Sequence, residues 1–317
     1  MSLVPAISTD QLTKCFGAHS AVDGVTLQVR PGEIFGFLGA NGAGKTTTIM
    51  MLLGILPPSN GSIRILGQEM GERSLTLKTR IGVVSEHQSL YGEMTAEEYL
   101  AFFADLYAVP NARRRIGDLL AALDLEGRRG SRVKTFSRGM QQKLATARAL
   151  LHSPELLVMD EPASGLDPYG ISQIRELINE QKRQGRTVFL SSHLLSEIEQ
   201  TADRVAIIAR GRIVSEGSMA DIRRELSPDA RYVLEYEGDE GALRRALRRV
   251  GGLRRAEADG TKLVLSVASG EDARGEISRA VAAAGGVVLG LTRQEMSLEE
   301  AFLAVTEDGF GRMTETN

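Results

Sequence analysis

Two short segments of this 317-residue chain contain residue types suited to binding phosphate. The first, GANGAGKTT, places glycines before a lysine and two threonines, and it lies between a strand-like EIFGFLG and a helix-like IMMLLGIL. Glycines let backbone N–H groups converge on phosphate oxygens, the lysine reaches the terminal phosphate, and a threonine hydroxyl can ligate Mg²⁺. This pattern and its context define a P-loop. We expect ATP to be held by Gly39, Asn41, Gly42, Gly44, Lys45, Thr46 and Thr47.

Acidic residues follow the apolar run LLVMD, which reads as a buried strand. Asp160 at its end is the expected Mg²⁺ partner, together with Thr46. Glu161 could act as the general base for an attacking water, an effect worth about 10²–10⁴-fold in rate. A Glu that caps a helix or turn is the alternative, and the segment PASGLDP directly after it argues against that role.

His193 follows another strand-like run, TVFLSS, where its ring could reach the terminal phosphate. The chain has four histidines, and they lack the spacing of a metal site. A lone histidine is commonly a core or surface residue, so the position after a sheet strand is what makes His193 a catalytic candidate.

The second phosphate-binding segment is FSRGMQQ, residues 136–142, which runs into the helix-like KLATARALL. The Ser137 hydroxyl and the amides around Gly139 could hold an anion at a helix N-terminus. Since the P-loop already provides one phosphate site, this second site needs its own ligand.

Strand-like and helix-like segments alternate around these motifs. Strand patterns occur at 34–39, 62–66, 81–85, 156–160, 187–192 and 204–209. Helical periodicity dominates about 95–152 and returns at 168–184, where Pro168 suits a first turn and Gly185 a stop. We therefore predict an α/β P-loop fold with a mixed, mostly parallel sheet and a helical insertion.

The chain after residue 226 has a different pattern. SPDA at 227–230 reads as a linker, and a β-α-β-β-α-β order follows, with Asp259-Gly260 as a hairpin turn. This order predicts a small α+β ferredoxin-like domain. The expected domains are an ATPase domain at 1–226, with its helical subdomain at about 86–152, and an accessory domain at 231–317.

Composition narrows the class of protein. Hydrophobic content of 42% and charged content of 25% are ordinary for a globular protein. The longest apolar runs fall far short of the roughly 20 residues of a membrane-spanning helix, and we see no signal-peptide pattern at the start. One cysteine excludes an internal disulfide. A net charge of −3 gives no indication of nucleic-acid binding.

GANGAGKTT, FSRGMQQ, LLVMDEPASGLDP and SSH, in this order, resemble the ATP-binding subunit of ABC transporters over about residues 5–225. The resemblance implies that FSRGMQQ is the signature loop, in which Ser137 and Gly139 contact ATP held by a second copy of the subunit. That ATP would be the ligand of the second phosphate site. The family's usual signature has two glycines, and Arg138 replaces the first of them here.

Three further residues receive roles from the resemblance alone. Phe16 corresponds to the aromatic residue that stacks on adenine, although it could instead be a core phenylalanine. Glu86 stands where the family usually has a glutamine, and it could ligate Mg²⁺ or its water. Asp167 belongs to the loop that links the two nucleotide sites of a dimer.

The resemblance implies an ATPase that powers export through a separate permease chain at the cytoplasmic face of the cell membrane. The C-terminal domain, which ends in MSLEEAFLAVTE, points to the exporter branch. Alternatives are a soluble ABC ATPase acting on ribosomes or DNA, and a regulatory ABC ATPase without transport. The helical spacing of Leu298, Ala301, Phe302 and Val305 fits simple packing better than a partner groove.

Overall fold

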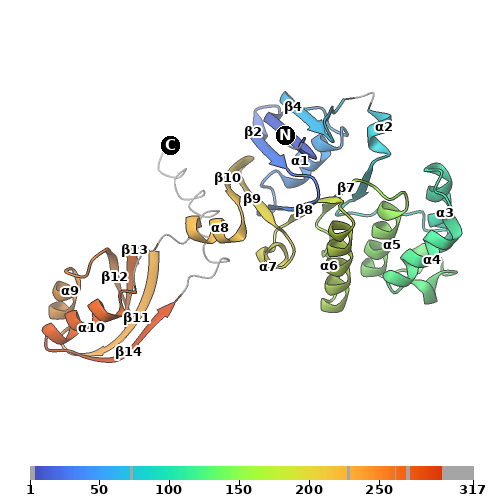
Figure 1. Ribbon diagram of the computed structural model, residues 1–317. Helices are drawn as coiled ribbons and strands as arrows, with labels where there is room; N and C mark the ends of the chain where they lie inside the picture. The colour runs from blue at the N-terminus through green and yellow to red at the C-terminus, as the bar shows by residue number, and fades with distance from the viewer. Residues whose placement is uncertain (1–3, 72–73, 227–228, 261, 269–271, 295–317) are drawn as a thin grey trace. The chain divides into compact units, whose positions relative to one another are not determined.

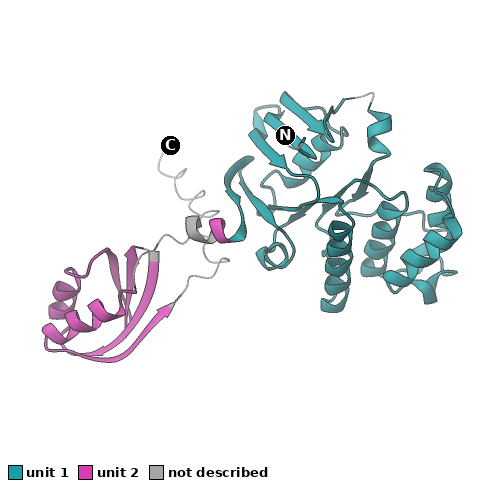
Figure 2. Ribbon diagram, viewed as in Figure 1, with its two compact units in different colours: residues 1–219 teal, residues 220–317 magenta. Residues whose placement is uncertain are grey.

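The computed structural model describes residues 4–71, 74–226, 229–260, 262–268 and 272–294. The chain divides into two compact units, Met1–Met219 and Ala220–Asn317 (Figure 2). Among the described residues, no helix is both long and apolar enough to cross a membrane.

A six-stranded sheet forms the centre of the first unit, with strand order β10-β9-β3-β8-β7-β6 (Figure 1). All neighbouring pairs are parallel except β10 and β9, so the predicted mixed, mostly parallel sheet is confirmed. The strands are β3 (Ile34–Leu38), β6 (Ile81–Val84), β7 (Leu156–Asp160), β8 (Thr187–Ser192), β9 (Arg204–Ala209) and β10 (Arg212–Gly217).

The N-terminal strands form a separate antiparallel sheet of order β2-β1-β4-β5. Its strands are β1 (Ile7–Phe16), β2 (His19–Val29), β4 (Asn60–Ile65) and β5 (Gln68–Glu69). Helix α1 (Lys45–Leu52) contacts both β2 and β7, and one apolar core joins the two sheets around it. Phe189 lies at the centre of that core, 5.9 Å from Phe35 and 5.5 Å from Phe37 between ring centroids.

The helical insertion lies between two neighbouring strands. Strands β6 and β7 pair in parallel from Ile81↔Leu156 to Val84↔Met159, and the intervening chain folds into three helices that pack on one another. They are α3 (Ala96–Leu106), α4 (Ala112–Ala122) and α5 (Arg138–Leu150), with 3-10 turns at Glu126–Arg128 and Val133–Thr135. Thr95 and Glu98 form a capping box that starts α3.

The remaining helices of the first unit follow the sequence signals. Helix α6 (Pro168–Arg183) has Pro168 in its first turn and is followed by Gly185 with φ +79°, as predicted. The short helices are α2 (Leu75–Lys78) and α7 (Leu195–Glu199). The division between the units falls after Met219, the first residue of helix α8 (Met219–Leu226), whereas the sequence analysis placed the end of the ATPase domain at residue 226.

The second unit has the predicted β-α-β-β-α-β order and an antiparallel sheet of order β12-β13-β11-β14, which is the ferredoxin-like arrangement. Two helices pack on the sheet around a core that includes Tyr232 and Leu265. The elements are β11 (Asp229–Glu237), α9 (Glu240–Leu247), β12 (Leu253–Asp259), β13 (Lys262–Ala268), α10 (Arg274–Ala283) and β14 (Val287–Gln294).

One boundary in the sequence analysis needs correction. Asp229 and Ala230, predicted as linker, are the first residues of β11, where they pair with Ala268 and Val267. Strand pairing holds the backbone of these two residues in the sheet although Asp is uncommon in strands. The C-terminal helical pattern at 298–305 lies outside the described residues.

Candidate active site

The P-loop connects the buried strand β3 to helix α1. Gly42 and Gly44 have φ values of +81° and +109°, a region that favours glycine. A Cβ atom on Gly44 would also lie only 2.6 Å from the Ala21 carbonyl oxygen. The loop borders a cavity of about 280 Å³ lined by Ala21, Asn41, Gly42, Gly44, Lys45, Thr46, Thr47, Glu86 and Glu161.

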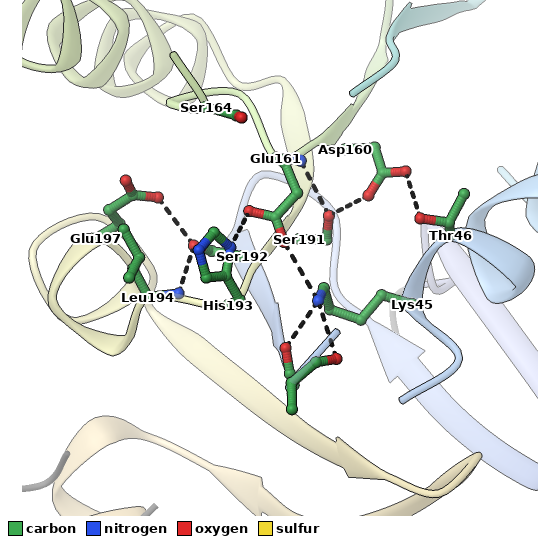
Figure 3. A network of polar contacts seen from close by, with 12 residues as sticks. Lys45, Thr46, Asp160, Glu161, Ser164, Ser191, Ser192, His193, Leu194 and Glu197 are labelled. Atoms are coloured by element: carbon green, nitrogen blue, oxygen red, sulfur yellow. Dashed lines mark hydrogen bonds and ion pairs between the residues drawn. The ribbon is translucent and has the colours of Figure 1, made fainter. Parts of the chain in front are cut away.

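Lys45 is buried, with 7% of its surface exposed, and its ammonium group lies inside this loop. Its Nζ donates to the carbonyl oxygens of Gly39 at 2.7 Å and Ala40 at 3.3 Å. The same Nζ lies 3.2 Å from Glu161 Oε1, so the two motifs that were predicted separately meet here (Figure 3).

Thr46 and Asp160 supply oxygen atoms beside the lysine. Thr46 Oγ1 donates to Asp160 Oδ2 at 2.9 Å, and the Ser191 hydroxyl donates to Asp160 Oδ1 (Figure 3). Hydroxyl and carboxylate oxygens are the ligands that Mg²⁺ prefers, and this ion commonly takes its other ligands from phosphate and water. Among the described residues, no group of three or more Asp, Glu, His or Cys side chains is arranged to hold a metal.

Glu161 has a backbone conformation that is uncommon for its residue type, with φ +50°. Its N–H donates to Ser191 Oγ at 3.1 Å, and its carbonyl accepts from Ser164 N at 3.1 Å. The carboxylate accepts from His193 Nδ1 at 2.8 Å through Oε2. Oε1 has no hydrogen-bond partner among the described residues, so the nearby Lys45 ammonium neutralises it by charge alone.

Two residues that the sequence analysis missed hold the segment that carries His193. Ser192 Oγ donates to Glu197 Oε2 at 2.9 Å and accepts from Leu194 N at 3.0 Å (Figure 3). Burial raises the pKa of Glu197, and the charge of Glu161 raises it further. The SSH pattern marked the position of this segment, but only the tertiary contact of α7 shows that Glu197 supports it.

Of Glu86, Phe16 and the nearby Gln88, only Glu86 lines the P-loop cavity. Gln88 instead donates to Gln142 Oε1 on α5 at 3.1 Å. Phe16 is 52% exposed at the end of β1, so it is not a core residue, and it does not line the P-loop cavity.

Ser137, Gly139 and Asp167 come together in a different cavity of about 430 Å³. Ser137 Oγ accepts from Met140 N at 3.3 Å and caps α5, so its hydroxyl hydrogen remains available for an anion. Asp167 Oδ1 accepts from Gly170 N at 2.8 Å and caps α6. The other lining residues are Arg138, Met140, Lys143, Gly165 and Leu166.

A P-loop that joins a parallel strand to a helix, facing an acidic pair at the end of another strand, defines a P-loop ATPase. A protein-family model described as ABC transporter matches residues 22–164. Bacitracin transport ATP-binding protein BcrA of Bacillus licheniformis is 44% identical over 211 residues, which cover 66% of this chain and 69% of that protein. Linearmycin resistance ATP-binding protein LnrL of Bacillus subtilis is 32% identical over 304 residues, 95% of this chain and 98% of that protein.

A solved structure of the ATP binding subunit of an ABC transporter also matches, with 36% identity and a TM-score of 0.65. The match covers 69% of this chain and 92% of that one. The chain therefore belongs to the family of ABC transporter ATP-binding proteins, and it is an ATPase.

Proposed function

We propose that this chain is the ATP-hydrolysing subunit of an exporter whose membrane helices belong to a separate permease chain. Two relatives support this reading, since one is named for bacitracin transport and the other for linearmycin resistance. In this proposal the subunit acts as a dimer at the cytoplasmic face of the cell membrane.

Residues in and beside the P-loop cavity supply the separate parts of this reaction. The loop amides and Lys45 bind the phosphates, while Thr46 and Asp160 would hold Mg²⁺, which would neutralise phosphate charge when bound. Glu161 accepts a proton from the attacking water. His193, which already donates to Glu161, orients that carboxylate toward the terminal phosphate.

The observation that carries the dimer is the separation of two phosphate-binding cavities in one unit. The P-loop lines one cavity, and Ser137, Gly139 and Asp167 line the other. If two chains pair head to tail, the signature cavity of each closes over the nucleotide in the P-loop of its partner. Each complete site then contains residues of both chains, and two nucleotides are enclosed.

Mixing two defective variants tests this arrangement. Lys45→Ala disables the P-loop of its own chain, and Ser137→Arg blocks its own signature loop. Each homodimer then has two defective sites, whereas a mixed dimer has one complete site. With Mg²⁺ and ATP, pull-down of one tagged variant by the other should exceed that of either variant alone.

The same pull-down without nucleotide is the control. If mixing gives no nucleotide-dependent gain, the signature loop acts within its own chain and the head-to-tail dimer is wrong for this protein.

A further inference from the structure

Arg138 stands where the usual signature has a glycine, and its side chain reaches a second loop. Its Nη2 donates to Ser164 Oγ at 3.2 Å. Its methylene groups lie over Gly165, where an added Cβ would be only 2.9 Å from Arg138 Cδ. Gly165 also has φ +77°, so a side chain there would be strained as well as obstructed. A glycine at position 138 could make none of these contacts.

Further contacts join the same two segments. The buried Gln142 donates from Nε2 to the Pro162 carbonyl at 3.2 Å. A Cβ on Gly139 would lie 3.3 Å from Leu166 Cδ2 and 3.5 Å from the Gly165 carbonyl oxygen, so the two segments approach closely. The N-terminal part of α5 is thus attached to the segment after Glu161 at several points, of which Arg138 is the most exposed.

The connection continues to the candidate general base. Ser164, which accepts from Arg138, donates its own N–H to the Glu161 carbonyl at 3.1 Å. Glu161 is in turn held by the hydrogen bond from its N–H to Ser191. One side chain and one short turn therefore link the signature loop to the backbone of Glu161 in the same chain.

We propose that Arg138 is a positioning residue that fixes the signature loop to the turn carrying Glu161. The proposal rests on the composite site proposed above. In that site the signature loop serves the partner's nucleotide, whereas Glu161 serves the nucleotide of its own chain. Arg138 makes these two groups move together, so that closure over one nucleotide also sets the glutamate at the other.

A double-mutant cycle in the full-length chain tests this link. Arg138→Gly and Ser164→Ala each remove one partner of the same hydrogen bond, so each should lower kcat by a similar factor, about 3- to 10-fold. KM for ATP should change less than kcat, because neither side chain lines the P-loop cavity, although Arg138 borders the signature cavity that closes over the partner's nucleotide. The double variant should be no slower than Arg138→Gly alone, and Arg138→Lys, which keeps a donor, should recover part of the rate.

Arg128→Gly is the matched control, an exposed arginine in a 3-10 turn outside both cavities, and it should retain the original kcat. Melting temperatures show whether any variant has lost stability instead. The proposed link would be overturned if Arg138→Gly kept the wild-type kcat. It would also be overturned if the kcat of the double variant fell by the product of the two single-variant factors. If either of these results were found while Lys45→Ala still pulled down Ser137→Arg, only the role of Arg138 would be rejected. The composite site would remain supported.

Discussion

Glu161 combines a strained backbone with a compensated charge. Residues held in the left-handed region cost about 1–3 kcal/mol, and they persist where surrounding contacts hold them. Here those contacts are hydrogen bonds from Ser164 to its carbonyl and from its own N–H to Ser191. The turn directs the carboxylate between Lys45 and His193, where a regular continuation of β7 would not place it.

Replacing Glu161 with Gln should separate nucleotide binding from hydrolysis. Gln keeps the size of the side chain but cannot accept a proton from water, so hydrolysis should fall by about 10²–10⁴-fold. Binding should remain, since the loop amides and Lys45 are retained, although Lys45 loses its ion pair with Glu161. Gel filtration with Mg²⁺ and ATP should show a persistent dimer, while hydrolysis at the wild-type rate would remove Glu161 from the mechanism.

The residues of the P-loop itself were predictable because their order along the chain reflects a local structure, a strand, a loop and a helix, whereas Ala21, which also lines the cavity, was not predicted. Glu197 and Gln142 were not predictable, because each acts through a contact that depends on tertiary packing. Their types and positions in the sequence contain no signal for those partners. Ser191 belongs to the predicted strand segment TVFLSS, but its hydrogen bonds to Asp160 and Glu161 depend on the pairing of β8 with β7.

At the scale of elements, helical and strand periodicity identified most segments, but local patterns do not specify which strands pair. The strand patterns at 34–39, 62–66 and 81–85 look alike in the sequence, yet the second lies in the antiparallel sheet as β4 and the other two lie in the six-stranded sheet as β3 and β6. Register shifts between β1 and β2 also interrupt the alternation of apolar and polar side chains by which a strand is recognised in a sequence.

His152, directly after α5, makes the packing of this helix sensitive to acid. Its ring stacks on Tyr107 with centroids 4.2 Å apart, and Nε2 donates to the Ile81 carbonyl at 3.2 Å. Nδ1 is buried without a hydrogen-bond partner among the described residues. Burial lowers the pKa of His152, and the charges of Arg186 and Arg115 lower it further.

Acid should therefore destabilise the first unit through this residue. The unfolded chain has a histidine pKa of about 6.5, above that of the folded state, so it binds more protons as the pH falls below this value. Melting temperature should drop between about pH 7.5 and 5.5. His152→Gln, which keeps a donor for Ile81, should show a smaller drop, and an equal slope in both proteins would contradict the assignment.

At the scale of the whole molecule, each unit has its own sheet and its own apolar core. The predicted site residues all lie in the first unit, before the division at residue 219. The second unit thus contributes none of them, and a role for it in association is consistent with the proposed export function.

Ending the chain after Leu226 should leave a folded, nucleotide-binding protein, because the core and the P-loop cavity are retained. We expect the truncated chain to bind ATP with an affinity within about threefold of the full chain, which corresponds to a change of less than about 0.7 kcal/mol in the binding free energy. Membrane co-fractionation in cells should instead decrease. Lys45→Ala in the truncated chain is the control for binding, and a truncated protein that cannot bind ATP would show that the units are interdependent.

The placement of the helical insertion between adjacent strands also bears on folding and divergence. Strands β6 and β7 can pair only after the chain between them has closed a long loop, which favours late formation of this edge. Closure entropy grows only with the logarithm of loop length, so an insertion half as long again would cost the sheet roughly 0.4 kcal/mol. Helices α3 and α4 can therefore change in length and sequence while the pairing of β6 with β7, the strand that carries Asp160, remains nearly as stable.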